Sequence, residues 1–272
     1  MILRFLNPKF YWDNLVYYWH IWRYDAAAMQ RQLVEQMAEW GFSYADTLEG
    51  VNQVLTSLGR SDYNAQIDAV LSFGSIHWLL FYAIGQTTSV RRILEIGTYD
   101  GETAFLLSKI FPHSEILTLD LPEDDPILRS TYHREQPEAL REFIELRNYN
   151  ITQPNIDYIA KNSFFAPEIL AGQFDLIWVD GGHLYPEIAW DICNAYHLCA
   201  PGGWILCDDV MTHPRAERTD YVSSDSHHVL EYVAARAQTP LAYFIKRTVP
   251  AWSANPRRRK FVAVMRKLQD NA

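Results

Sequence analysis

The chain has 272 residues, of which 49% are hydrophobic and 21% are charged, values that are typical of a soluble globular protein with one large domain and a terminal extension. Its formal net charge of −9 argues against a partner of the nucleic-acid class, because phosphate contacts need a basic surface. No apolar stretch is long enough for a membrane span, no signal peptide is evident, and the cysteines lack a C-x-x-C pair, so we expect a cytoplasmic protein.

Residues 1–63 are interpreted as an aromatic-rich helical extension. Four of its apolar residues recur at helical spacing, namely Trp12, Leu15, Trp19 and Trp22. A further helix is predicted over 27–42, where Gly41 ends it. We expect the apolar stripe to pack on the main domain or on a second subunit. The alternatives are a lid over the substrate and a membrane-surface anchor.

From residue 64 to residue 272 the pattern becomes an alternation of helices and strands. Strands are predicted over 92–96, 115–119, 157–160, 176–179 and 204–207. Helices are predicted over 69–84, 103–111, 137–148 and 186–199. This alternation predicts an α/β fold with a parallel sheet and right-handed crossovers. The last two strands, 241–247 and 260–265, have no helix between them, so we expect an antiparallel pair at the edge of the sheet.

The first predicted strand leads into a glycine turn that runs from Gly97 to Gly101. A strand, a tight glycine turn and a helix can cradle a nucleotide. Tyr99 stands where a dinucleotide fingerprint has its second glycine, and it would obstruct a pyrophosphate. Glu95 suits a ligand that carries positive charge. Asp120 ends the second strand about 20 residues after the turn, where an acid can bind both ribose hydroxyls.

Two acidic motifs end later strands of the predicted sheet. Asp180 ends one strand, and Asp208 and Asp209 end the next, so the three acids should meet at the carboxyl edge. Their mutual repulsion would be relieved by a hard divalent ion such as Mg²⁺, unless they cap helices or hold loop amides instead. His183, three residues after Asp180, suits the role of a general base, and the alternative is a packing or helix-start role.

The sequence LEIGTYDG at 94–101 resembles class I S-adenosylmethionine-dependent methyltransferases, in particular the catechol and caffeoyl-coenzyme A O-methyltransferase group. The resemblance implies a Rossmann-like sheet of seven strands, mostly parallel with an antiparallel last strand and with helices on both faces. It covers roughly residues 65–215 and makes 64–272 the S-adenosylmethionine-binding domain. The residues that it places at the cofactor are Glu95, Gly97, Thr98, Tyr99, Gly101, Asp120, Leu121, Asn162, Ser163 and Asp180.

The acidic motifs are similar to those of metal-dependent O-methyltransferases of macrolide sugars. Those enzymes place a catalytic histidine three residues after a metal-binding aspartate and an acid pair at the end of the next strand. The resemblance implies that His183 and Asp180 are catalytic. It also implies that Asp180, Asp208 and Asp209 bind Mg²⁺. Asp209 favours the sugar-modifying relatives, because the catechol group has an asparagine at the matching position.

These observations together predict Mg²⁺-assisted O-methylation of a hydroxyl on a small molecule, such as a sugar or another natural-product scaffold, by a homodimer. Two alternatives remain: an NAD-dependent oxidoreductase, and a non-catalytic subunit that binds an adenosyl ligand. Three further histidines, His213, His227 and His228, fall in or after the loop that follows Asp209, where substrate contacts and solvated positions are equally plausible.

Overall fold

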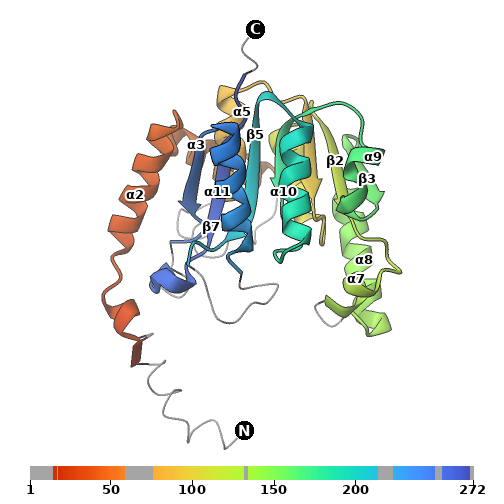
Figure 1. Ribbon diagram of the computed structural model, residues 1–272, viewed down its shortest axis with the longest axis horizontal. Helices are drawn as coiled ribbons and strands as arrows, with labels where there is room; N and C mark the ends of the chain where they lie inside the picture. Colours follow the sequence, from red (N-terminus) through yellow and green to blue (C-terminus); the bar gives the residue numbers. More distant parts are fainter. Residues whose placement is uncertain are drawn as a thin grey trace, which may run out of the picture.

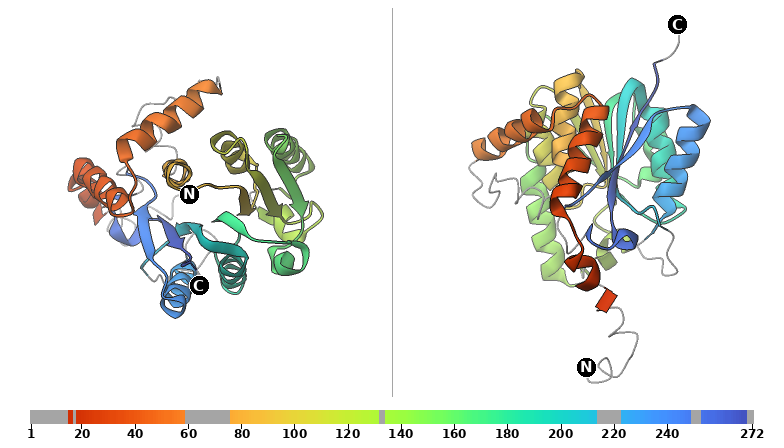
Figure 2. Two further views of the ribbon diagram at one scale, coloured as in Figure 1. Left: turned by 90° about the horizontal axis from the view of Figure 1, so that it is seen from above. Right: turned by 90° about the vertical axis from the view of Figure 1, so that its left-hand side faces the viewer.

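The computed structural model describes residues 15, 16, 18–58, 76–131, 134–213, 223–248 and 253–269. These residues build a seven-stranded sheet with helices on both faces (Figures 1 and 2). The strands are β1 (Arg92–Ile96), β2 (Glu115–Asp120), β3 (Ile156–Ala160), β4 (Phe174–Val179), β5 (Cys199–Val210), β6 (Leu241–Ile245) and β7 (Phe261–Arg266). Their order across the sheet is β3-β2-β1-β4-β5-β7-β6.

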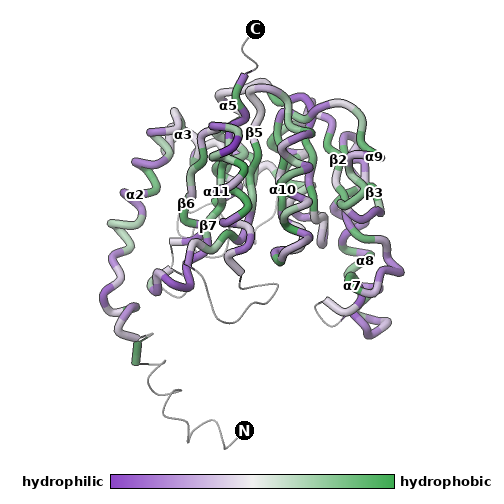
Figure 3. The backbone as a smooth tube through the Cα atoms, in the orientation of Figure 1, coloured by the Kyte–Doolittle hydropathy of each residue, from purple (hydrophilic) through white to green (hydrophobic). Residues whose placement is uncertain are grey.

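Strands β1 to β5 are parallel, and β7 runs antiparallel to both of its neighbours, β5 and β6. The predicted Rossmann-like sheet with an antiparallel last strand is therefore confirmed. Its central strands are buried on both faces, so they consist of continuous apolar runs such as Leu176 to Val179. Figure 3 shows this hydrophobic character along β5, in contrast to the more hydrophilic residues of the outer helices.

The helices form one layer on each face of the sheet. One layer contains α9 (Ala166–Ile169), α10 (Glu187–Leu198) and α11 (Asp225–Ala237). The opposite layer contains α2 (Ala26–Glu39), α3 (Tyr44–Ser57), α5 (His77–Thr87), α6 (Glu102–Ile110) and α8 (Pro137–Ile151). Short helices in the connections are α7 (Pro126–Ser130), η3 (Ser163–Phe165) and η4 (Pro256–Arg258).

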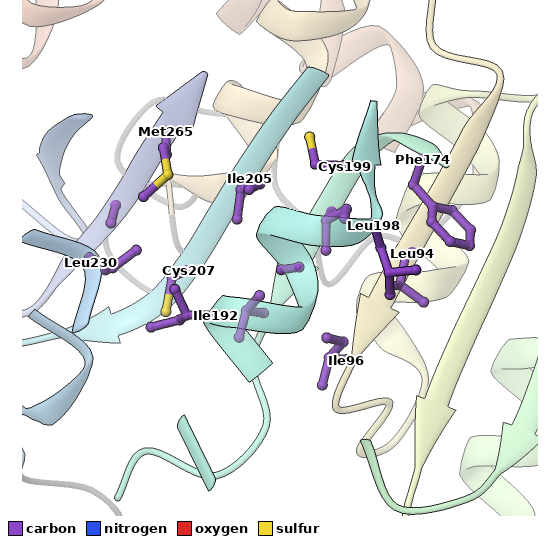
Figure 4. Close-up of a cluster of buried hydrophobic side chains, with 14 of the residues drawn as sticks. Leu94, Ile96, Phe174, Ile192, Leu198, Cys199, Ile205, Cys207, Leu230 and Met265 are labelled. Atoms are coloured by element: carbon purple, nitrogen blue, oxygen red, sulfur yellow. The ribbon is translucent and has the colours of Figure 1, made fainter. Parts of the chain in front are cut away.

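A buried hydrophobic cluster between the sheet and the α10–α11 layer holds β1 and β5 against α10. Figure 4 shows Leu94 and Ile96 of β1, Ile205 of β5 and Ile192 of α10 in this cluster. All four side chains are at most 2% exposed. Because β1 and β5 are both packed against α10, their carboxyl ends hold a defined position relative to each other.

The described part of the N-terminal extension is helical, and its apolar stripe faces solvent. Helix α2 begins after the N-cap Asp25, and Gly41 follows its end with a φ of +77°. Leu15, Trp19 and Trp22 are 64%, 50% and 82% exposed, so the stripe does not pack on the described part of the domain. Trp12 and the expected boundary between residues 63 and 64 lie outside the described residues.

Helix α11 is the main departure from the sequence-based expectation. This helix was not predicted, and it carries His227 and His228, which follow the loop after Asp209 as expected. The helix predicted over 69–84 is described only from His77, as α5, and continues to Thr87. No helix among the described residues is long and apolar enough to cross a membrane.

Candidate active site

The carboxyl ends of β1, β2 and β4 are joined by backbone hydrogen bonds around Gly97. The N–H of Gly97 donates to the carbonyl of Leu119 at 2.8 Å, and the N–H of Asp180 donates to the carbonyl of Ile96 at 2.8 Å. Gly97 has a φ of +96°, and a Cβ atom there would lie 2.2 Å from the carbonyl oxygen of Asp180. Only glycine allows the β1 turn to approach β4 this closely.

Asp120 is the anchor of the glycine turn. Its two carboxylate oxygens accept hydrogen bonds from the backbone N–H groups of Tyr99, at 2.8 Å, and of Leu121, at 2.7 Å. Burial raises the pKa of this carboxyl, and the two N–H bonds oppose the rise. Tyr99 itself has a φ of +48° and a side chain that is 46% exposed. The predicted ribose acid therefore has a fixed orientation next to the turn.

Glu95 lies directly under the turn and is fully buried. One of its oxygens accepts a hydrogen bond from the Thr118 hydroxyl at 2.5 Å, and Thr98 contacts the same hydroxyl at 2.6 Å. The other oxygen, Oε1, is buried and has no hydrogen-bond partner among the described residues. Burial raises the pKa of Glu95 to about 8, and the charges of Asp120 and Asp100 add to the rise. A cationic ligand would relieve this unsatisfied buried acid.

Asp208 and Asp209 end β5 and are held by two lysines from the last strands. Lys246 Nζ lies 2.5 Å from Asp208 Oδ2 and 2.6 Å from Asp209 Oδ1, and Lys260 Nζ lies 2.5 Å from Asp209 Oδ2. Asp209 sits at an irregularity in the β5–β7 pairing and has a φ of +54°. Burial alone would raise its pKa, but the charges of Lys246 and Lys260 outweigh burial and lower the pKa below its ordinary value.

The strand register explains why these lysines reach the acids. Phe261, the first residue of β7, pairs with Val210 of β5 on one side and with Ile245 of β6 on the other. Lys246 directly follows β6 and Lys260 directly precedes β7, so both arrive at the carboxyl end of β5. Their backbones are joined by the hydrogen bond from Lys246 N to Lys260 O at 3.0 Å.

The predicted magnesium ligands do not fit a metal ion in this arrangement. The Lys246 ammonium lies between Asp208 and Asp209, where a shared cation would have to bind. Within the described ranges, no group of three or more histidine, cysteine or acidic side chains has an arrangement that could hold a metal. Metal binding by Asp180, Asp208 and Asp209 stays a prediction, and lysines of the last strands are the groups that pair with Asp208 and Asp209 in this structure.

His183 and Asp180 lie side by side in the loop after β4. His183 Nε2 is 3.8 Å from Asp180 Oδ1, which is too long for a hydrogen bond, and the His183 side chain is 15% exposed. Burial lowers the pKa of His183, although the charges of Asp209 and Asp208 oppose the change. Burial also raises the pKa of Asp180 well above its ordinary value, and the charge of Asp208 adds to this. Burial therefore favours the neutral form of the His183 imidazole.

Comparison with known proteins identifies the domain that contains these residues. Residues 94–210, which run from β1 to the end of β5, match the family model of a methyltransferase domain. This part of the chain therefore matches a methyltransferase domain. The match covers the glycine turn, Asp120, His183 and the acid pair, in agreement with the methyltransferase class predicted from these motifs. No curated protein matches the sequence.

Two solved structures share the fold of this methyltransferase domain. A putative caffeoyl-CoA O-methyltransferase from Staphylococcus aureus is similar with a TM-score of 0.51 and 14% identity, over 79% of this chain and 98% of that chain. A putative O-methyltransferase from Klebsiella pneumoniae is similar with a TM-score of 0.50 and 16% identity, over 82% of this chain and 90% of that chain. At these identities the likeness establishes the fold alone.

The two residues expected near adenine, Asn162 and Ser163, make local hydrogen bonds within the protein. Asn162 Oδ1 accepts a hydrogen bond from the N–H of Phe164 at 2.9 Å and so begins η3. The buried Asp191 of α10 accepts a hydrogen bond from the Ser163 side chain, and burial raises the pKa of Asp191 to about 6. A contact of Asn162 and Ser163 with adenine stays a prediction.

Sequence reasoning missed Lys246 and Lys260, which are the closest partners of the acid pair. Their signal was present, since one follows the apolar run of β6 and the other precedes that of β7. These positions predict a contact with the acid pair only when the pairing register of β6 and β7 is known. His213 was named and lies in the loop after β5, where its Nδ1 is 3.3 Å from the Thr212 hydroxyl.

Replacing Glu95 with glutamine is expected to change how the stability of the methyltransferase domain depends on pH. The folded pKa of about 8 lies above the unfolded value of 4.5, so the wild-type protein loses stability as the pH rises from 4.5 to 8. The variant should lack this loss, which amounts to up to about 5 kcal/mol. Urea unfolding at pH 5 and pH 8 measures it, with the exposed Glu142→Gln variant as the control. Equal pH dependence in all three proteins would contradict the assignment.

Proposed function

We propose that this protein transfers the methyl group of S-adenosylmethionine to a hydroxyl oxygen of a small molecule, with His183 as the general base. The observation that carries the proposal is the position of His183, whose partly exposed imidazole lies beside Asp180 in the loop after β4. Strands β1 and β4 are neighbours, so this loop and the glycine turn after β1 leave the sheet about 5 Å apart. This arrangement supports a role for His183 as a base next to the predicted cofactor site.

The residues around the glycine turn fit the cofactor in shape and charge. Gly97 and Gly101 have positive φ angles and let the turn pack closely against the end of β4 and against α8, which shapes the predicted cofactor site. Glu95 offers a buried carboxyl oxygen without a hydrogen-bond partner among the described residues, which suits the positive charge of S-adenosylmethionine. Asp120, fixed by two backbone N–H groups, would accept hydrogen bonds from the ribose hydroxyls.

The proposed reaction moves one proton and one methyl group. The acceptor hydroxyl donates a hydrogen bond to His183, which takes the proton as the oxygen attacks the methyl carbon. A carbon–oxygen bond forms, the carbon–sulfur bond breaks, and the sulfonium becomes the neutral thioether of S-adenosylhomocysteine. Asp180, with Oδ1 3.8 Å from His183 Nε2, would stabilise the imidazolium. Most of the acceleration should come from the alignment of oxygen, methyl and sulfur.

We propose that the acceptor is a sugar or another hydroxylated natural-product scaffold. That class rests on the spacing of Asp180, His183 and the acid pair, which is similar to that of the sugar-modifying relatives. A panel of hydroxylated small molecules with radiolabelled S-adenosylmethionine would test it. Label that transfers only to amines or carboxylic acids would contradict O-methylation of this class.

Calorimetric titration with S-adenosylhomocysteine tests the cofactor part of the proposal, with NADH as the control ligand. We expect micromolar binding of the former and none of the latter. Asp120→Ala should abolish binding, because the variant loses the ribose acid and the anchor of the turn. Asp157→Ala, on the exposed part of β3, is the matched control and should bind as the wild type does. Binding of NADH in place of S-adenosylhomocysteine would contradict the proposal.

We also propose that the protein is a homodimer in which the exposed apolar stripe of the extension is covered. Trp19 and Trp22 are 50% and 82% exposed, and large apolar side chains grouped on a surface mark interaction sites. The double variant Trp19→Ser/Trp22→Ser is therefore expected to sediment as a monomer while it still binds S-adenosylhomocysteine. Tyr149→Ser, on the exposed side of α8, should leave the dimer intact. Sedimentation of the wild type as a monomer would contradict the dimer.

A further inference from the structure

We propose that the Lys246 ammonium is the built-in cation of the acceptor site and stands where a divalent metal ion would otherwise bind. The inference rests on the proposed function, because it concerns the acceptor side of the same site. In this account the acidic edge of the domain needs no Mg²⁺, and Lys246 is a positioning residue for Asp208 and Asp209.

The first argument is the number of acid oxygens that remain for a metal. Asp208 and Asp209 have four carboxylate oxygens, and three of them are within 2.6 Å of a lysine Nζ. The fourth, Asp208 Oδ1, is buried and has no hydrogen-bond partner within the described ranges. Mg²⁺ prefers near-octahedral oxygen coordination, commonly with one or two carboxylates, so a single buried oxygen from this pair is a poor site.

The second argument is that the ammonium is buried together with the acids. The side chains of Lys246 and Asp208 are only 9% and 5% exposed. A buried charge is retained only where it is paired, because its desolvation is costly. Lys246 pairs with both acids at once, as a bridging metal ion would do. A divalent ion could enter only by displacing this lysine.

The third argument is that the backbone fixes the ammonium in place. Lys246 extends β6, and its N–H donates to the carbonyl of Lys260 at 3.0 Å, so both lysines are held by the β6–β7 register. Lys246 O in turn accepts a hydrogen bond from the N–H of Ile76 at 3.1 Å. The backbone of Lys246 is therefore held at the end of the sheet, next to the acid pair.

Titration with Mn²⁺, followed by the electron paramagnetic resonance signal of the free ion, tests the inference directly. The wild type is expected to bind no Mn²⁺ up to millimolar concentration. Lys246→Gln removes the ammonium and leaves the acids, so it should bind Mn²⁺ at least 10-fold more tightly than the wild type. Lys267→Gln is the matched control, because the Lys267 ammonium donates to the carbonyls of Tyr196 and Cys199, and it should behave as the wild type.

Two results would overturn the inference. One is stoichiometric Mn²⁺ binding by the wild type that Asp208→Asn abolishes, and the other is a folded Lys246→Gln variant with no gain in affinity. If Lys246→Gln does not fold, Lys260→Gln serves instead, since its side chain is 26% exposed and it also frees an oxygen of Asp209. The S-adenosylhomocysteine titration reports on the proposed function separately, because Lys246 and Lys260 are not among the predicted cofactor residues.

Discussion

The His183→Ala variant is expected to lower the rate of methyl transfer by about 10²–10⁴-fold, the usual contribution of a general base. Its affinity for S-adenosylhomocysteine should be unchanged, because His183 is not among the predicted cofactor residues. Initial rates on the first acceptor that the wild type methylates would measure the effect. The exposed His113→Ala variant, at the amino edge of the sheet, is the control and should retain the wild-type rate.

The pH profile separates a base from a structural role. His183 must be neutral to accept a proton, and burial lowers its pKa, so the wild-type rate should rise on the acidic side and already be level at neutral pH. The variant should lack the limb of the profile that belongs to His183. An unimpaired His183→Ala variant would contradict the role of His183 as the base. It would not contradict the proposed binding of S-adenosylmethionine.

The Gly97→Ala variant is expected to lose S-adenosylhomocysteine binding and to be destabilised by about 2–4 kcal/mol. The added Cβ would lie 2.2 Å from the carbonyl oxygen of Asp180, and the φ of +96° is unfavourable for any residue but glycine. Relief of this clash requires the ends of β1 and β4 to separate. The turn and the loop of His183 would then move apart.

Thermal unfolding and calorimetry of the Gly97→Ala variant check both parts of this expectation. Gly182→Ala is the matched control in the neighbouring loop, because its added Cβ would be 3.4 Å from its closest contact, Glu187 Cβ. That variant should keep nearly the wild-type melting temperature and affinity. A Gly97→Ala protein with both properties intact would show that the close approach of β1 and β4 is not required.

The sheet could be predicted from the sequence because its strands are short apolar runs between turn signals. The prediction over 92–96 coincides with β1, and the resemblance carried by the glycine turn implied the seven-stranded sheet with an antiparallel last strand. Helix α11 was missed because few of its residues, such as Leu230 and Ala234, are buried hydrophobics. Its apolar pattern is too weak to predict a helix around His227 and His228.

The electrostatics of the candidate site could be predicted only in part. Asp180, His183, Asp208 and Asp209 were placed at one edge because each follows a strand. The positively charged groups that pair with these acids could not be predicted. Lys246 and Lys260 reach the acids through the antiparallel register of β5, β7 and β6, which no local sequence pattern encodes. Mutual repulsion among the acids was correctly anticipated, and the groups that relieve it were not.

The position of β7 between β5 and β6 has a consequence for the order in which the chain folds. Lys246 follows Asp208 by 38 residues in the sequence, and Lys260 follows Asp209 by 51. A growing chain therefore presents the acids of β5 well before it can supply their lysines. Since β6 reaches the sheet only by pairing with β7, insertion of β7 both completes the sheet and neutralises the acids. We therefore expect the acid pair at the carboxyl end of β5 to be neutralised only after this last strand has been synthesised.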